Sequence, residues 1–396
     1  MHRSSWARLF SPLLLAVVIV TASAAQSSLE PRVVNIPAAD GTVLKATYFA
    51  AAKPGPGVLL FHQCNQERRS WDALASSLAA SGIHVLTVDY RGFGESGGTP
   101  VGKLPPAERQ QIQTEKWPGD MDTAFDYLVS QPGVKRDVIG AGGASCGVNQ
   151  SIQLARRHPE VKSLVLLSGN TDRSGREFVK NSPKLPIFGS AADDDAGAVE
   201  LMEWVLSLSA NPGTRFEHYK TGGHGTEMFA PHKELPDMIV EWFSTTLVKT
   251  PGKAPAAPSS ARAPENAQIL AMFDEPGGTA KVAEKLAEAR KRDPKAVLFP
   301  EGVVNIMGYE HMQNGDTKGA IEILKLNVTA FPRSANTYDS LADAYLADGQ
   351  RELAKQNAQK ALELLASDTE SPEDRKKLIR DSAEQKVKEL GGGAQE

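Results

Sequence analysis

The residues of this chain best suited to chemistry begin with a serine between small neighbours. The run Gly143-Ala144-Ser145-Cys146-Gly147 fits the pattern G-x-S-x-G, and it lies between an apolar run and a helical pattern. A serine at the apex of such a turn sits in a strained backbone conformation, so the residues two positions away must be small. The amides that begin the following helix would face the serine, where they stabilise a negative oxygen. The pattern therefore predicts Ser145 as a nucleophile.

A serine nucleophile needs a base, and the base needs an acid that orients it. His224 lies in a glycine-flanked loop after a strand-like run, and we predict that it is the general base. Asp195 is the predicted acid, with Asp194 as the alternative. We expect Asp193 to be solvated, because three adjacent carboxylates cannot all be buried. The chain has no H-E-x-x-H pattern and no phosphate-binding glycine loop, so no metal or other cofactor is predicted.

Alternating strand and helix patterns from residue 57 to about residue 248 position these groups. Continuous apolar runs, typical of strands buried on both faces, alternate with amphipathic helical patterns. This order predicts an α/β fold, a mostly parallel sheet with helices on both faces, after an antiparallel hairpin within residues 33–49. Ligands bind at the carboxyl ends of strands in such sheets, and each of the three candidates follows a predicted strand. We expect His218, within the last strand, to be a packed side chain.

Two segments near these strand ends have other expected roles. The glycine-rich loop of residues 89–96 is expected to be structural, with Arg91 pairing with nearby carboxylates. Residues 97–118 show no clear periodicity. We expect a loop there, which is either a lid or an entry loop of the site, or a plain surface excursion.

The order nucleophile, acid, base along the chain is that of the α/β-hydrolase fold. Over residues 32–248 the chain resembles the dienelactone-hydrolase-like branch of that superfamily. The motifs that carry the resemblance are residues 62–64, 89–96, 143–147, 193–195 and 222–225. Dienelactone hydrolases use a cysteine within G-x-C-x-G, but here Ala144 and Val148 stand where that frame requires glycines. We therefore assign the nucleophile to Ser145 and keep Cys146 as the alternative.

The resemblance also implies the donors of an oxyanion hole. One is the backbone N–H of Cys146, and the other comes from the loop after the strand that ends at Phe61. We predict the N–H of Cys64 as that second donor, with Gln63 as the alternative, and we expect His62 to belong to the same loop. Both cysteines of the chain then fall at one site. They either form a disulfide or remain two free thiols, and a Cα separation above about 7 Å would exclude the bond.

The chain divides into further segments outside this domain. Residues 26–249 form the predicted hydrolase domain, and residues 250–265 are a Pro/Ala/Ser-rich linker. Residues 266–390 are predicted to be helical, with a 34-residue repeat that places Gly315 opposite Gly349 and resembles the tetratricopeptide repeat. Residues 391–396 are expected to be a disordered tail.

The N-terminus resembles a secretory signal. Residues 1–25 combine basic residues, an apolar stretch and the small residues Ala22-Ser23-Ala24 of a cleavage site. An uncleaved membrane anchor is the alternative. We therefore expect a protein exported to the periplasm or secreted, with no membrane span after cleavage.

These observations predict an exported serine hydrolase that cleaves carboxylic ester, lactone or related acyl bonds in a small-molecule substrate. The alternative is a scaffold whose helical repeats bind a peptide or protein partner, with an inactive or secondary hydrolase domain. A net charge of −4 gives no indication of nucleic-acid binding.

Overall fold

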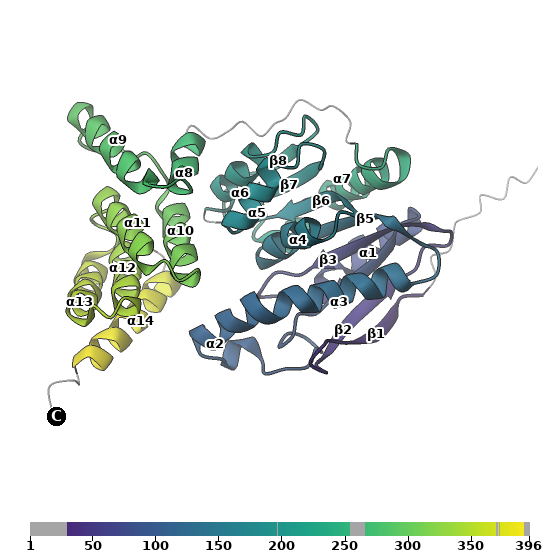
Figure 1. Ribbon diagram of the computed structural model, residues 1–396, viewed down its shortest axis with the longest axis horizontal. Helices are drawn as coiled ribbons and strands as arrows, with labels where there is room; N and C mark the ends of the chain where they lie inside the picture. Colours follow the sequence, from purple (N-terminus) through teal and green to yellow (C-terminus); the bar gives the residue numbers. More distant parts are fainter. Residues whose placement is uncertain (1–29, 196, 254–265, 370, 372, 392–396) are drawn as a thin grey trace, which may run out of the picture.

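The computed structural model describes residues 30–195, 197–253, 266–369, 371 and 373–391 of the chain (Figure 1). These residues form a sheet domain, residues 30–253, and a helical domain, residues 266–391. The predicted signal segment, most of the predicted linker and the end of the predicted tail lie outside the described residues. Among the described helices, none is long and apolar enough to span a bilayer.

The sheet domain is built on eight strands in the order β1-β2-β4-β3-β5-β6-β7-β8. The strands are β1 (Arg32–Pro37), β2 (Val43–Phe49), β3 (Gly55–Phe61), β4 (His84–Val88), β5 (Val134–Ala144), β6 (Val161–Leu167), β7 (Ile187–Ala192) and β8 (Arg215–Tyr219). β1 pairs antiparallel with β2, and β2 antiparallel with β4, while the remaining pairs are parallel. The predicted hairpin and mostly parallel sheet are therefore confirmed.

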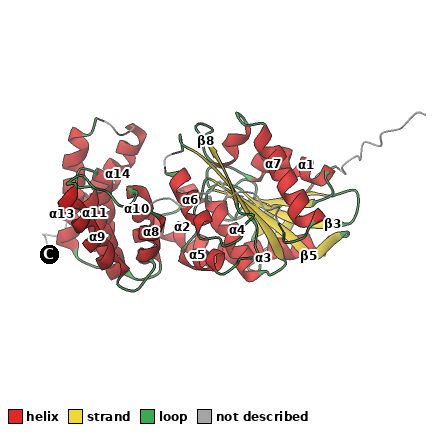
Figure 2. Ribbon diagram, turned by 90° about the horizontal axis from the view of Figure 1, so that it is seen from above, coloured by secondary structure: helices red, strands yellow, loops and turns green. Residues whose placement is uncertain are grey.

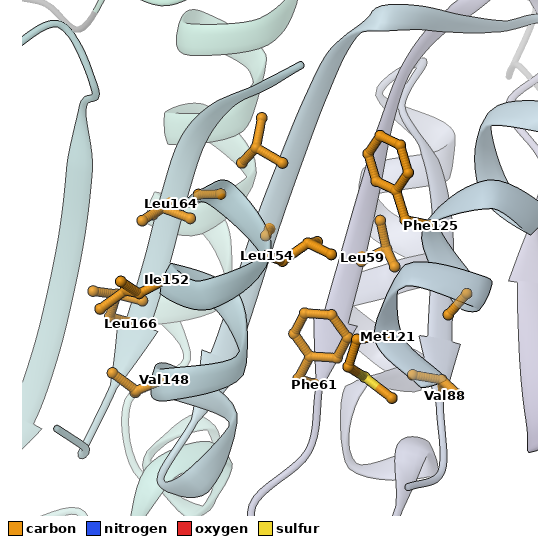
Figure 3. Close-up of a cluster of buried hydrophobic side chains, with 14 of the residues drawn as sticks. Leu59, Phe61, Val88, Met121, Phe125, Val148, Ile152, Leu154, Leu164 and Leu166 are labelled. Atoms are coloured by element: carbon orange, nitrogen blue, oxygen red, sulfur yellow. The ribbon is translucent and has the colours of Figure 1, made fainter. Parts of the chain in front are cut away.

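Helices cover both faces of this sheet (Figure 2). They are α1 (Asp72–Ala80), α3 (Trp117–Ser130), α4 (Cys146–Arg157), α5 (Arg173–Lys180), α6 (Ala198–Ser207) and α7 (Glu234–Phe243). The short helix α2 (Pro106–Gln111) precedes α3 and projects beyond the sheet (Figure 1). The two buried clusters follow the alternation of side chains along each strand. In β3, Leu59 and Phe61 pack with α3 and α4, as Figure 3 shows, whereas Val58 and Leu60 pack with α1 and α7.

The expectation of an irregular segment at residues 97–118 is wrong. Most of it is helical, because α2 continues through a π-helical segment, Ile112–Lys116, into α3. Residues 108–116 are exposed or half-buried, so the segment lacks the apolar stripe by which helices are found in a sequence. Its Glu, Arg, Gln and Lys side chains favour a helix, and Pro106 occupies the first helical turn, where proline is tolerated.

The helical domain contains α8 (Ala267–Phe273), α9 (Gly278–Arg292), α10 (Glu301–Gln313), α11 (Thr317–Ala330), α12 (Ala335–Ala347), α13 (Arg351–Ser367) and α14 (Glu373–Gly391). Starts at Glu301 and Ala335, and at Thr317 and Arg351, are each 34 residues apart, which matches the predicted period. Gly315 and Gly349 occupy the two equivalent turns with φ of 79° and 75°. All-α structure in this region is confirmed, and its assignment as a tetratricopeptide repeat stays a prediction.

Arg176 of α5 joins the two domains. Its side chain is only 3 % exposed, and it forms ion pairs with Asp274 at 2.8 Å and with Glu310 of α10 at 2.9 Å. Its guanidinium also lies over the ring of Trp204, 4.5 Å from the centroid. Trp204, on α6, belongs to the same apolar cluster as Leu270 of α8 and other residues of the helical domain. The helical domain is therefore packed against α5 and α6 of the sheet domain.

Replacing Arg176 with alanine is expected to lower the free energy of unfolding by about 3 kcal/mol, because Glu310 would remain buried without its counter-charge. Urea unfolding followed by tryptophan fluorescence measures this loss. Arg173→Ala is the control. Arg173 also reaches the helical domain, through a hydrogen bond to the carbonyl oxygen of Asp274 at 2.6 Å, but it is exposed and its ionic partner Glu177 is exposed as well. Its removal leaves no buried charge unpaired, so the loss should be within about 1 kcal/mol. Equal losses in the two variants would contradict a buried ionic contact between the domains.

Candidate active site

Ser145 lies in the turn between β5 and α4 with φ 54° and ψ −118°. Positive φ is strained for a residue with a side chain, and only Ser145 and Ser168 adopt it among the described non-glycine residues. A Cβ atom on Gly143 would lie 2.0 Å from the carbonyl oxygen of Gly147, and one on Gly147 would lie 2.4 Å from the carbonyl oxygen of Phe61. The backbone of the turn thus leaves no room for a side chain at either glycine, as the sequence pattern predicted.

Asp195 and His224 meet at the carboxyl ends of β7 and β8. The Oδ2 atom of Asp195 lies 2.7 Å from Nδ1 of His224. The carboxylate raises the pKa of His224 above its usual value, mainly through this hydrogen bond, while burial opposes the shift. A proton on Nδ1 shared with the carboxylate leaves Nε2 as the basic nitrogen.

The neighbouring carboxylates have different partners. Asp194 accepts hydrogen bonds from the backbone N–H groups of Gly222, at 3.0 Å, and Gly223, at 3.1 Å, and these bonds lower its pKa. Asp194, the alternative acid, thus holds the loop that carries the candidate base. Asp193 is exposed and lies 2.6 Å from His218. The expectation that His218 is packed is wrong, because β8 is an edge strand and the side chain is 44 % exposed.

Gln63 is a site residue whose contact sequence reasoning did not identify. Its buried Oε1 accepts hydrogen bonds from the N–H of Thr226, at 2.9 Å, and from its hydroxyl, at 3.1 Å. Its Nε2 donates to the carbonyl oxygen of His224 at 3.2 Å. One carboxamide therefore ties the loop after β3 to the loop of the candidate base. The sequence placed Gln63 in the correct loop, but no local pattern indicates a contact across 161 positions.

Cys64 and Cys146 form a disulfide with a Cα separation of 5.9 Å. The bond joins the loop after β3 to the first residue of α4. Neither backbone N–H of these cysteines donates a hydrogen bond to another residue in the described part of the chain, so both are available to an oxyanion. The sulfur of Cys146 is already bonded, which leaves no thiolate for the alternative nucleophile.

Two other predicted neighbours are structural. His62 is fully buried, its Nε2 accepts the N–H of Tyr90 at 3.2 Å, and its Nδ1 donates to the carbonyl oxygen of Gln63 at 2.8 Å. Burial lowers the pKa of His62, so it is a neutral imidazole. Arg91 pairs with Asp120 at 2.6 Å and Asp40 at 2.7 Å, as expected.

Two cavities adjoin the disulfide. One, of about 680 Å³, lies beside Cys64, Phe93 and Arg109. The other, of about 570 Å³, lies beside Cys146 and is lined by residues of both domains. Gln113, between α2 and α3, lines both. The segment expected to be irregular is therefore a helical wall next to the candidate site.

Within the described ranges, no cluster of His, Cys, Asp or Glu side chains could hold a metal ion.

A profile of the family described as "Serine aminopeptidase, S33" matches residues 52–185. This match includes β3, the turn at Ser145 and α5, within the strand order described above. The sheet domain has the α/β-hydrolase fold. Asp195 and His224 lie beyond the matched residues, so their assignment rests on the geometry of this chain.

Two curated fungal proteins are similar to part of this α/β hydrolase. Thiohydrolase aneE of Aspergillus aculeatus is 28 % identical over 141 residues, which cover 35 % of this chain and 41 % of the relative. Acyltransferase drtE of Aspergillus calidoustus is 29 % identical over 148 residues, which cover 37 % of this chain and 45 % of the relative. The chain thus spans less than half the length of these relatives.

Solved structures also resemble the α/β hydrolase domain. The complex of DcsB with its substrate analogue has a TM-score of 0.47 at 16 % identity. The superposition covers 55 % of this chain and 100 % of the DcsB chain. A dienelactone hydrolase from Anabaena variabilis has a TM-score of 0.43 at 18 % identity, and it covers 55 % of this chain and 98 % of that one.

The pKa of the His224 imidazole is expected to lie above that of an ordinary histidine, because its hydrogen bond to Asp195 stabilises its charged form. Asp195→Asn removes the carboxylate charge and leaves the burial, so the titration midpoint should fall. Proton NMR of the imidazole C–H signals measures both values, with His224→Gln identifying the resonance. A midpoint that does not move in Asp195→Asn would show that the carboxylate does not govern this histidine.

Proposed function

We propose that this chain is a serine hydrolase that cleaves carboxylic ester, lactone or related acyl bonds through an acyl-enzyme. The contact between His224 and Asp195, at the strand ends beside the strained Ser145, is the observation that carries the proposal. The contact supplies the base and the acid that orients it, and the strained turn supplies a half-buried serine at its apex.

In this mechanism the Oγ atom of Ser145 attacks the carbonyl carbon while Nε2 of His224 takes the hydroxyl proton. Asp195 keeps the ring in the tautomer with the proton on Nδ1 and stabilises the imidazolium. The backbone N–H groups of Cys146 and Cys64 bind the oxyanion. His224 then gives the proton to the leaving oxygen, which departs and leaves the acyl group on Ser145. Water then attacks the carbonyl carbon of that ester while Nε2 of His224 takes a proton from the water. His224 gives this proton to Oγ of Ser145 as the acid product leaves.

The bond that is cleaved is proposed to be an ester or a thioester. Two relatives are named a thiohydrolase and an acyltransferase, and these names support an acyl compound as the substrate. Because neutral His224 is the base and its pKa is raised, turnover should increase as the pH rises through that pKa.

Ser145→Ala is expected to lower kcat for p-nitrophenyl acetate by about 10⁴-fold or more, because no other described group takes the place of the nucleophile. The control is the double variant Cys64→Ala with Cys146→Ala, which removes the disulfide and both sulfur atoms but keeps both backbone amides. It should retain far more turnover than Ser145→Ala. Loss of turnover in the cysteine variant, with Ser145→Ala active, would assign the nucleophile to Cys146.

We also propose that the chain is exported. A disulfide is typical of oxidising compartments, and the pair Cys64–Cys146 supports the export expected from the N-terminal sequence. Mass spectrometry of the protein from the producing cells should find an N-terminus near Ala24 or Ala25. A protein that still begins at Met1 would contradict cleavage.

A further inference from the structure

We propose that the end of α10, in the helical domain, forms part of the substrate site and selects substrates that carry neutral hydrogen-bonding groups. This inference rests on the proposed function, because it concerns the substrate of the same site. It assigns Gln313 and Asn314 a role in specificity. The groups they recognise are hydroxyls or amides, each of which is both a donor and an acceptor of hydrogen bonds.

The cavity of about 570 Å³ lies next to Cys146, the residue after Ser145, although Ser145 and His224 do not themselves line it. Cys146 lines it, and the backbone N–H of Cys146 is the proposed donor to the oxyanion. Three walls surround the cavity: the start of α4 with α5, the helical wall at residues 113–117, and the last residues of α10. Its volume lies within the ~300–1,000 Å³ typical of small-molecule sites. A substrate held at Ser145 can therefore extend into a space that the sheet domain does not enclose by itself.

The wall made by α10 is held in place. Glu310, one turn before Gln313, lines the cavity and pairs with the buried Arg176 of α5 at 2.9 Å. Arg176 also binds Asp274, which follows α8, so the same guanidinium ties two parts of the helical domain to the sheet domain. The cavity is consequently a feature of the packed chain and does not require a closing motion.

Carboxamide side chains dominate the polar lining of this cavity. They are Gln113, Asn149, Gln150, Gln313 and Asn314. Oδ1 of Asn149 accepts hydrogen bonds from the hydroxyl of Thr171 and from the N–H of Asp172, so its NH₂ group is left to donate to a ligand. The other four side chains hydrogen-bond to no other residue in the described ranges. Gln150 is the most informative, because it is only 6 % exposed and still has no protein partner. A ligand in the cavity is the partner that its position indicates.

The charged groups of the lining are already occupied. Glu310 pairs with Arg176, and Arg173 pairs with Glu177 at 3.4 Å. Asp172 accepts from Gln153 and Ser174 and from the N–H of Gly175. Arg173 is the only cation of the lining and is already paired, so an anionic ligand would find no free counter-charge. Asp172 has no cationic partner in the described part of the chain, but its oxygens already accept hydrogen bonds from three neutral donors. An alkyl chain would leave the carboxamides without partners. The lining thus fits a neutral portion that bears hydroxyl or amide groups.

The test compares matched pairs of substrates. To vary the alcohol portion of the ester substrate, hydrolysis of 6-O-acetylglucose is compared with hydrolysis of hexyl acetate. To vary the acyl portion, hydrolysis of p-nitrophenyl N-acetylglycylglycinate is compared with hydrolysis of p-nitrophenyl octanoate. The measured quantity is the selectivity, the ratio of kcat/KM for the polar member to that for the apolar member. The double variant Gln313→Leu with Asn314→Leu should lower the selectivity about tenfold or more in one pair, and that pair identifies whether hydroxyls or amides are recognised.

The control is Gln356→Leu with Gln359→Leu. It exchanges two exposed carboxamides of α13, which does not line the cavity, and it should leave both selectivities as in the parent protein. Unchanged selectivity in the α10 variant, or an equal fall in the control, overturns the inference while p-nitrophenyl acetate is still hydrolysed. If the parent protein does not turn over p-nitrophenyl acetate, the proposed function fails, and the inference fails with it.

Discussion

The close approach of backbone segments around Ser145 is the constraint on which the site depends. The start of α4 lies so near the end of β3 that a Cβ atom on Gly147 would meet the carbonyl oxygen of Phe61 at 2.4 Å. Because these two segments touch, the residue after Ser145 and the loop after β3 become neighbours. The disulfide and both proposed oxyanion donors follow from that one contact. A bulkier turn would separate the donors and move the nucleophile away from both.

The sequence predicted the sheet and the turn because their causes are local. Apolar strand runs, and small residues around Ser145, leave patterns that can be read within a few positions. The assignment of Asp195 over Asp194 came from the register after β7, and the 2.7 Å contact with His224 agrees with it. Only the part of residues 97–118 from Pro106 onward was misjudged. Its helix is polar on its exposed faces, and periodicity detects a helix only through an apolar stripe.

What the sequence did not indicate depends on contacts between distant parts of the chain. Gln63 holds the His224 loop through hydrogen bonds that no spacing rule encodes. Arg176 appeared to be an ordinary basic residue in a short helix, yet it is buried between the domains with two carboxylates and an indole ring. A helical repeat was expected to present its surface to a partner. The structure shows that α10 also packs one end against the sheet domain, and partner binding by the repeats stays a prediction.

The disulfide also makes a covalent ring. It joins residues 82 positions apart, and the ring contains α1, β4, α2, α3 and β5. Closing a ring of this size removes conformational freedom from the unfolded chain, which loop-entropy arguments value at ~4.5 kcal/mol. The disulfide can form only after residue 146 has left the ribosome. The loop after β3 is therefore linked covalently only once β5 has been synthesised. A single proteolytic cut anywhere between the two cysteines would leave both fragments attached to each other.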